Sequence, residues 1–179
     1  DGAPARALEY VRHGFTTIQS VGDYWPGVLA LRERLNAPGM PAPRLLVTGP
    51  MISPIGGHGA VDFPPCNAAP YCDEHGWFAE VGSSEDARRL VGELADAGVD
   101  GIKIAHDGNE LAYPSMKPMG HFAPGVLRTL IDAAHARGLR VYVHAYPMAN
   151  ALEALDAGAD AMAHGPGLFR VGGKGAPIE

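Results

Sequence analysis

The feature that most constrains the fold is a repeated unit in which a helix ends at a glycine and a short apolar strand follows. The unit occurs at least four times, with glycines at Gly14, Gly98, Gly138 and Gly158. Glycine suits the end of a helix because the chain there adopts a left-handed conformation that is costly for residues with a Cβ. Helices that alternate with apolar strands are typical of α/β proteins, in which right-handed crossovers join parallel strands.

Two α/β architectures fit this alternation, a doubly wound sheet and a (β/α)8 barrel. The sequence lacks the Gly-x-Gly-x-x-Gly motif that marks a dinucleotide-binding doubly wound fold. Ligand-type residues at the ends of the strands favour the barrel. A complete barrel takes about 250 residues, so a chain with five predicted strands is short of closure by roughly three strands. The predicted strands lie at 14–20, 44–49, 101–105, 140–145 and 160–164.

Three of these strands end on a side chain that can bind a metal ion. Lys103 lies five residues after Gly98, and His144 and His164 each lie six residues after their own glycine. The similar offset from the same landmark predicts that all three lie at one height, at the C-terminal edge of the sheet. A lysine between two isoleucines in a buried strand is costly unless it is paired, neutralised or modified. The alternatives are an edge-strand lysine facing water and histidines packed in the core. The pattern favours a metal site, with metal-assisted hydrolysis as its chemistry.

Other polar residues could surround the predicted metal site, at the C-terminal mouth of the barrel. His58 lies in the Gly- and Pro-rich stretch 49–70, which predicts a loop, and it is predicted to contact substrate. Tyr146 follows His144 by two residues and is predicted to contact substrate as well. His106 and Asp107 follow Lys103 closely and are further candidates for the lining. No Gly-x-Ser-x-Gly or Walker motif competes with the metal site, and no residue is assigned as a catalytic acid, base or nucleophile.

Composition excludes some classes of partner. The net charge is -6 over 179 residues, without a basic run, which argues against nucleic acid as a partner. No apolar stretch approaches the roughly 20 residues that span a bilayer. The chain starts at Asp1 with no signal-peptide pattern, so we expect a processed or trimmed N-terminus, and the location stays open between the cytoplasm and export. Cys66 and Cys72 could form a disulfide or remain two free thiols.

At these residues the chain resembles the amidohydrolase superfamily, in particular its imidazolonepropionase-like and prolidase-like branch. The resemblance covers most of the chain and follows the order of the family's second strand, the loop after its third strand, and its fourth, fifth and sixth units. It implies a (β/α)8 TIM barrel, of which residues 1–179 form a partial domain covering roughly strands 2 to 6, without strand 1 and strands 7 and 8. The matching segments are 14–18, 53–59, 81–104, 134–145 and 157–165.

The resemblance also implies a site chemistry. Lys103 matches the strand-four lysine that in many members is carboxylated by CO2 and bridges two metal ions. His144 and His164 match the ligands of the more exposed metal. These matches imply one or two divalent ions, with zinc the favoured metal. They further imply that a metal-bound hydroxide cleaves amide (C–N) or ester bonds of small molecules such as dipeptides, N-acyl amino acids or cyclic amides.

The sequence departs from the family in two places. It contains neither the His-x-His of the family's first strand nor the aspartate of its eighth strand. We therefore expect the chain to be a piece of a longer enzyme and to be inactive alone. Its expected partners are a small-molecule substrate and either a second copy of the chain or the missing barrel segments. The alternative is a non-catalytic barrel fragment that binds a metal or a ligand.

Overall fold

The computed structural model shows helices and strands alternating along residues 3–58, 76–107 and 119–165, the parts of the chain that the structure describes. Cys66 and Cys72 lie outside these parts. Within the same ranges, no helix combines the length and apolar character needed to cross a membrane. In chain order the elements are α1 (Ala3–Arg12), β1 (Thr17–Gln19), α2 (Gly27–Leu35), β2 (Arg44–Leu46), β3 (Met51–Pro54), β4 (Phe78–Val81), α3 (Ser84–Asp96), β5 (Gly101–Ala105), α4 (Val126–Ala136), β6 (Arg140–His144), α5 (Met148–Asp156) and β7 (Ala161–Met162).

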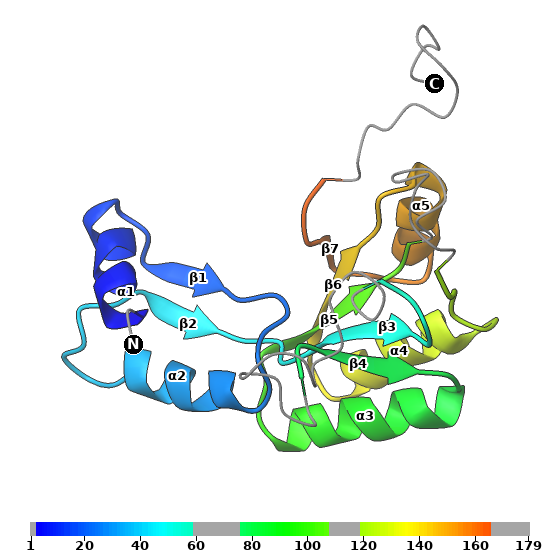
Figure 1. The fold of residues 1–179 in the computed structure, drawn as a ribbon, viewed down its shortest axis with the longest axis horizontal. Helices are drawn as coiled ribbons and strands as arrows, with labels where there is room; N and C mark the ends of the chain where they lie inside the picture. The colour runs from blue at the N-terminus through cyan, green and yellow to red at the C-terminus, as the bar shows by residue number, and fades with distance from the viewer. Residues whose placement is uncertain (1–2, 59–75, 108–118, 166–179) are drawn as a thin grey trace, which may run out of the picture.

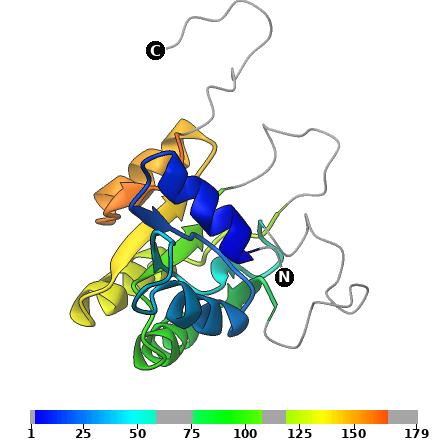
Figure 2. The ribbon, with the colours of Figure 1, turned by 90° about the vertical axis from the view of Figure 1, so that its left-hand side faces the viewer.

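All strand pairs in the described residues are parallel. One sheet has the order β4-β3-β5-β6-β7, and β1 and β2 form a separate pair. Figure 1 shows that pair with α1 and α2 on the left and the larger sheet on the right. Figure 2 looks onto the left-hand side and shows α1 in front. The sheet does not close on itself within the described residues, as expected for an incomplete barrel.

The main sheet separates an apolar face from a polar one. Ile102 and Ile104 of β5 belong with Val141 and Val143 of β6 to one buried cluster, which α3, α4 and α5 complete from the outside. Figure 1 shows α3 and α4 side by side along this face. Side chains alternate along a strand, so the residues between these aliphatics face the other way. The opposite face of the sheet therefore carries Lys103 and its neighbours.

The five predicted strands are all present, each no longer than predicted. The predicted loop from residue 49 onward is wrong for Met51–Pro54, which forms β3 and pairs with both β4 and β5. The strand β4 was not predicted from the sequence. The many glycines and prolines in this region are typical of loops, so the sequence pattern did not indicate either strand. Ile52 and Val81 are nevertheless buried in the main cluster. Pro54 is tolerated because it ends its strand, where a missing N–H costs little.

Two aspartates, each directly before the start of a strand, bind the backbone of a neighbouring segment. The Asp100 carboxylate accepts the Val47 N–H at 2.9 Å, and the Asp100 N–H donates to the Val47 carbonyl at 2.8 Å. Asp160 makes the same pair of bonds with Val141, at 2.8 Å and 3.1 Å. Each aspartate lies two residues after the glycine that ends the preceding helix. The Gly-x-Asp sequence therefore acts as a clamp at the start of a strand, and Asp100 joins the β1–β2 part to the main sheet.

We expect Asp100→Ala to lower the free energy of unfolding by about 1–3 kcal/mol, because it leaves the buried Val47 N–H without its acceptor. The change also removes a carboxylate oxygen 3.2 Å from Arg32. Urea unfolding followed by circular dichroism measures the effect. Asp132→Ala, at an exposed position on α4, is the matched control and should stay within about 0.5 kcal/mol of the wild type. Equal effects for the two variants would contradict the clamp.

Candidate metal centre

The structure brings together two of the three predicted metal ligands. His144 ends β6 and is buried, whereas His164 follows β7 and is exposed. The His144 Nδ1 atom lies 2.6 Å from the His164 Nε2 atom, and the ring centroids are 4.5 Å apart. Two imidazole nitrogens from successive strands thus meet at the C-terminal edge of the sheet. Neutral imidazole nitrogens are common ligands of divalent metals.

Lys103 lies deeper in the sheet than these histidines. It pairs in register with Tyr142, whereas His144 pairs with Ala105, two residues further along β5. The predicted equal height is therefore wrong. Gly101, three residues after Gly98, pairs with Arg140, two residues after Gly138. Lys103 also has the shorter offset, so it lies lower than His144. Lys103 is only 4% exposed, and burial lowers its pKa from 10.5 to about 8 against the attraction of Asp107.

Asp107 is the centre of the polar cluster. Its Oδ2 atom accepts a hydrogen bond from His144 Nε2 at 2.8 Å, and its Oδ1 atom lies 3.4 Å from His58 Nδ1. The second contact has an ion-pair distance without hydrogen-bond geometry, so Oδ1 is buried without a hydrogen bond among the described residues. Burial by itself raises the pKa of Asp107, but the two histidines outweigh it and hold the pKa well below its usual range. Burial lowers the pKa of His144, against the attraction of Asp107.

A metal ion could be held at this cluster. One donor atom from each of His58, Asp107 and His144 lies within 4.8 Å of the others. Two nitrogens and one carboxylate oxygen suit zinc and other first-row metals. The set shares His144 with the His144–His164 pair, but it approaches the ring from its other nitrogen.

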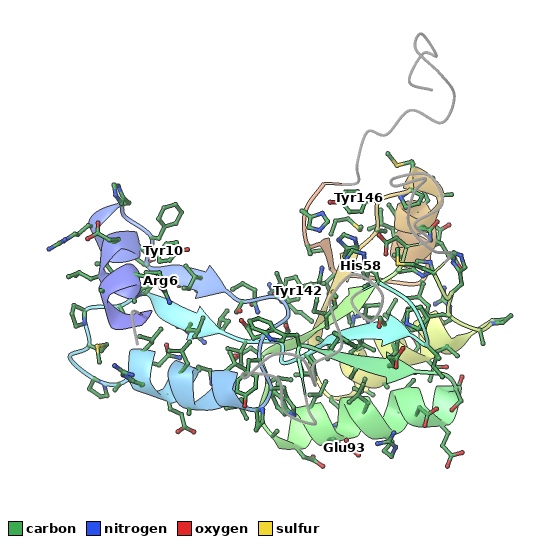
Figure 3. The ribbon with its side chains drawn as sticks, viewed as in Figure 1. Arg6, Tyr10, His58, Glu93, Tyr142 and Tyr146 are labelled. Carbon is green, nitrogen blue, oxygen red and sulfur yellow. The ribbon has the colours of Figure 1, made fainter. Side chains whose placement is uncertain are left out.

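The two predicted substrate contacts lie at the same mouth. Figure 3 shows His58 and Tyr146 near one end of the sheet. The Tyr146 ring is 4.7 Å from that of His144 and 5.8 Å from that of His164, measured between centroids. The His58 and His144 rings are 4.3 Å apart. Both residues are therefore placed to meet a molecule that approaches the histidine pair.

The loop that carries His58 is fixed by its neighbours. The Gly56 N–H donates to Glu80 Oε1 at 2.6 Å, and the Gly120 N–H donates to the Gly56 carbonyl at 2.8 Å. A Cβ added at Gly120 would lie 1.9 Å from the Ile55 carbonyl oxygen. This approach between two backbone segments is open only to glycine.

The polar face also links the two parts of the molecule. The Tyr142 hydroxyl donates to Gln19 Oε1 at 3.3 Å, which connects β6 to β1. Figure 3 shows Tyr142 between the β1–β2 part and the main sheet. Tyr142 crosses close to Gly101, where an added Cβ would lie 3.0 Å from the ring and 2.7 Å from the Arg140 carbonyl oxygen.

Sequence reasoning undervalued Asp107 and overvalued His106. Asp107 was predicted only to line the mouth, yet it contacts two histidines. His106 faces away from the cluster and contacts Glu153 Oε2 on α5 at 2.9 Å. Alternation along the extended chain after β5 sends these adjacent residues in opposite directions. The position of Asp107, four residues after Lys103 and on the same side, was the available signal.

The comparisons with known proteins identify the class of fold. No protein-family model matches the sequence, and no curated protein does. Solved structures do match. A Xaa-Pro dipeptidase with bound methionine is 26% identical with a TM-score of 0.70, covering 88% of this chain and 39% of its own. An amidohydrolase is 29% identical with a TM-score of 0.63, covering 86% of this chain and 38% of its own. Phenylurea hydrolase B is 26% identical with a TM-score of 0.62, covering 87% of this chain and 36% of its own.

These neighbours identify the fold as part of a barrel of the kind found in solved hydrolases. The resemblance to the amidohydrolase superfamily is confirmed, and the chain corresponds to part of such a barrel. It spans less than two fifths of the length of these three structures.

We expect Gly120→Ala to displace the His58 loop and to cost about 1–3 kcal/mol of stability, because a backbone carbonyl occupies the place of the new methyl group. Denaturant unfolding measures the cost, and the chemical shifts of the His58 ring report the displacement. Gly92→Ala, on α3, is the control. A Cβ there meets nothing within 4 Å, so the variant should gain up to about 1 kcal/mol from helix propensity. Unchanged stability and unchanged His58 chemical shifts in Gly120→Ala would show that Gly120 does not hold the loop that carries His58.

Proposed function

We propose that the protein is a metal-dependent hydrolase that cleaves amide (C–N) bonds of small molecules, with a divalent cation held by His144 and His164 beside Lys103. The chain's neighbours include hydrolases, and the polar residues lie at the C-terminal edge of a parallel sheet, where barrel enzymes keep their active sites. Because the chain spans only part of these neighbours, the activity proposed is that of the whole protein.

The observation that carries this proposal is the orientation of the two imidazole rings. His144 Nε2 meets the Asp107 carboxylate at 2.8 Å, and His164 Nδ1 faces the Gly165 carbonyl oxygen at 3.4 Å. A carboxylate and a carbonyl only accept hydrogen bonds, so the outer nitrogens are placed to carry the protons. The inner nitrogens, 2.6 Å apart, then both present lone pairs. Two facing lone pairs repel each other unless a proton or a cation lies between them.

The residues around the pair have separable tasks in this proposal. A divalent cation bound there would polarise a substrate carbonyl and supply a nucleophilic water at neutral pH. Asp107 holds the outer proton of His144. His58 and Tyr146 line the mouth and would orient the substrate. Positioning of this kind lowers the entropic part of the barrier.

Lys103 is proposed to serve as a carboxylated ligand. A buried ammonium is costly, and reaction with CO2 would turn it into an anionic oxygen donor suited to zinc. The support is its burial on the polar face of the sheet, with Asp107 as the charge that acts on it. One or two zinc ions would then be bound in the complete protein.

The substrate class follows from the neighbours as a proposal. A Xaa-Pro dipeptidase and a phenylurea hydrolase are among them. Dipeptides and N-acyl amino acids are therefore the first compounds to test, followed by cyclic amides and esters. We also propose that the open edges of the sheet are covered by further barrel segments or by a second copy of the chain, since exposed strand edges invite pairing.

The test is hydrolysis of this panel by the full-length protein, before and after metal removal with a chelator. We expect activity to disappear on chelation and to return with zinc. Metal content is measured in parallel by mass spectrometry. Activity that survives complete metal removal would contradict the proposal.

We expect Lys103→Ala to lower kcat/KM by several orders of magnitude, because it removes the proposed bridging ligand and the cation that depends on it. His58→Ala should cost roughly tenfold to a few hundredfold, as loss of one positioning contact does. A short carboxylic acid should partly restore Lys103→Ala but not His144→Ala, since only the first variant has lost an anionic oxygen donor that a carboxylate can replace. Full activity and full metal content in Lys103→Ala would contradict the assignment of Lys103 as a metal ligand.

A further inference from the structure

Asp107 joins three segments that lie far apart in the chain. The residue follows β5, contacts His144 at the end of β6, and contacts His58 in the loop after β3. It is 3% exposed, so the carboxylate itself is removed from bulk water, whereas the His58 side chain is 22% exposed. Each oxygen faces a different histidine. A carboxylate so placed can control how both rings are held.

The contact with His144 decides which nitrogen of that ring is available. A neutral imidazole carries one proton, on Nδ1 or on Nε2. The 2.8 Å distance between Asp107 Oδ2 and His144 Nε2 is typical of a charge-assisted hydrogen bond, which requires the proton on Nε2. The lone pair is then on Nδ1, the nitrogen that faces His164.

We propose that Asp107 is a positioning residue that fixes the tautomer of His144, so that His144 Nδ1 can bind the cation. The inference rests on the function proposed above. Asp107 would orient a ligand of that metal site without binding the metal itself. Metal-binding histidines usually donate their other N–H to a carboxylate or a carbonyl, which orients the ring and raises its basicity. The second oxygen of Asp107 holds the His58 ring beside that of His144, with centroids 4.3 Å apart.

The competing arrangement is direct ligation by His58, Asp107 and His144, whose donor atoms also lie close together. It needs the His144 Nε2 lone pair, whereas the His144–His164 pair needs the Nδ1 lone pair. A His144 ring that is protonated at Nε2 can bind a metal only through Nδ1. The hydrogen bond to Asp107 favours the arrangement through Nδ1.

The first test reads the tautomer in the metal-free full-length protein by two-bond 1H–15N correlation of the His144 ring. We expect the Nε2–H form in the wild type and a mixture in Asp107→Ala. Asp107→Asn should shift the ring toward the Nδ1–H form, because its amide can donate to Nε2. An unchanged His144 tautomer in both variants would overturn the proposal.

The second test measures zinc affinity by chelator competition. We expect Asp107→Asn to weaken binding by about 10–100-fold, the usual cost of losing such a partner. Asp107→Glu, which restores a carboxylate, should recover part of the loss. His58→Gln should stay within a few fold of the wild type. Equal losses in His58→Gln and Asp107→Asn, with His144 bound through Nε2, would make the three residues ligands and reject the positioning role.

The control separates positioning from folding. Asp100→Asn weakens a structural clamp far from His144, so it should lower stability and leave the His144 tautomer and the zinc affinity unchanged. Thermal unfolding of every variant shows that each is folded at the temperature of measurement. If the wild type binds no zinc, the proposed function fails, and the tautomer measurement alone still decides the role of Asp107. If zinc and hydrolysis are present but the tautomer does not respond to Asp107, only this inference fails.

Discussion

The ladder between β5 and β6 is the contact on which the rest of the structure depends. The two strands pair in parallel along all five residues of each. This pairing sends Ile104 and Val143 together to the helix side and Lys103 and Tyr142 together to the other side. Burying one such aliphatic side chain stabilises the fold by about 1.5–3 kcal/mol. The helix-facing cluster can therefore offset the cost of keeping a lysine, an aspartate and a histidine out of water on the opposite side.

The clamps at the starts of the strands determine where the ends of the strands lie. Asp100 binds Val47, which follows β2, and Asp160 binds Val141 of β6, each through both backbone and side chain. The strands β5 and β6 pair over their full length, so their last residues, Ala105 and His144, lie opposite each other, and Lys103 lies two residues earlier on β5. Lys103 is consequently deep and buried, His144 is higher and buried, and His164 is at the exposed rim. The three residues therefore lie at different heights along the strand direction, from the buried middle of β5 to the exposed residue after β7.

Local signals in the sequence located five of the strands but not β3 and β4, and they did not predict the long-range contacts. Gly98, Gly138 and Gly158 have φ values of 82°, 71° and 100°, as their predicted place after a helix requires. Ser83 precedes α3, and its hydroxyl accepts the Asp86 N–H at 3.1 Å, as is typical of a serine that caps the N-terminus of a helix. The contact between Asp107 and His144 spans 37 residues and depends on the register of two strands. A sequence pattern does not encode that register, so the height of Lys103 and the role of Asp107 emerged only from the fold.

The candidate site has buried residues, where substitution is costly, and exposed residues, where substitution is tolerated better. A change at Lys103 or Asp107 alters a buried polar group and its partners together, which is costly for folding. His164 lies at the rim, and the loop that carries His58 is attached from outside, by Glu80 and Gly120, not by the core. Such loops can change in sequence without loss of the scaffold. The solved neighbours are likewise similar in fold to this chain while they are named for substrates as different as a dipeptide and a phenylurea. Replacement of the buried polar residues should therefore cost more stability than replacement of those at the rim.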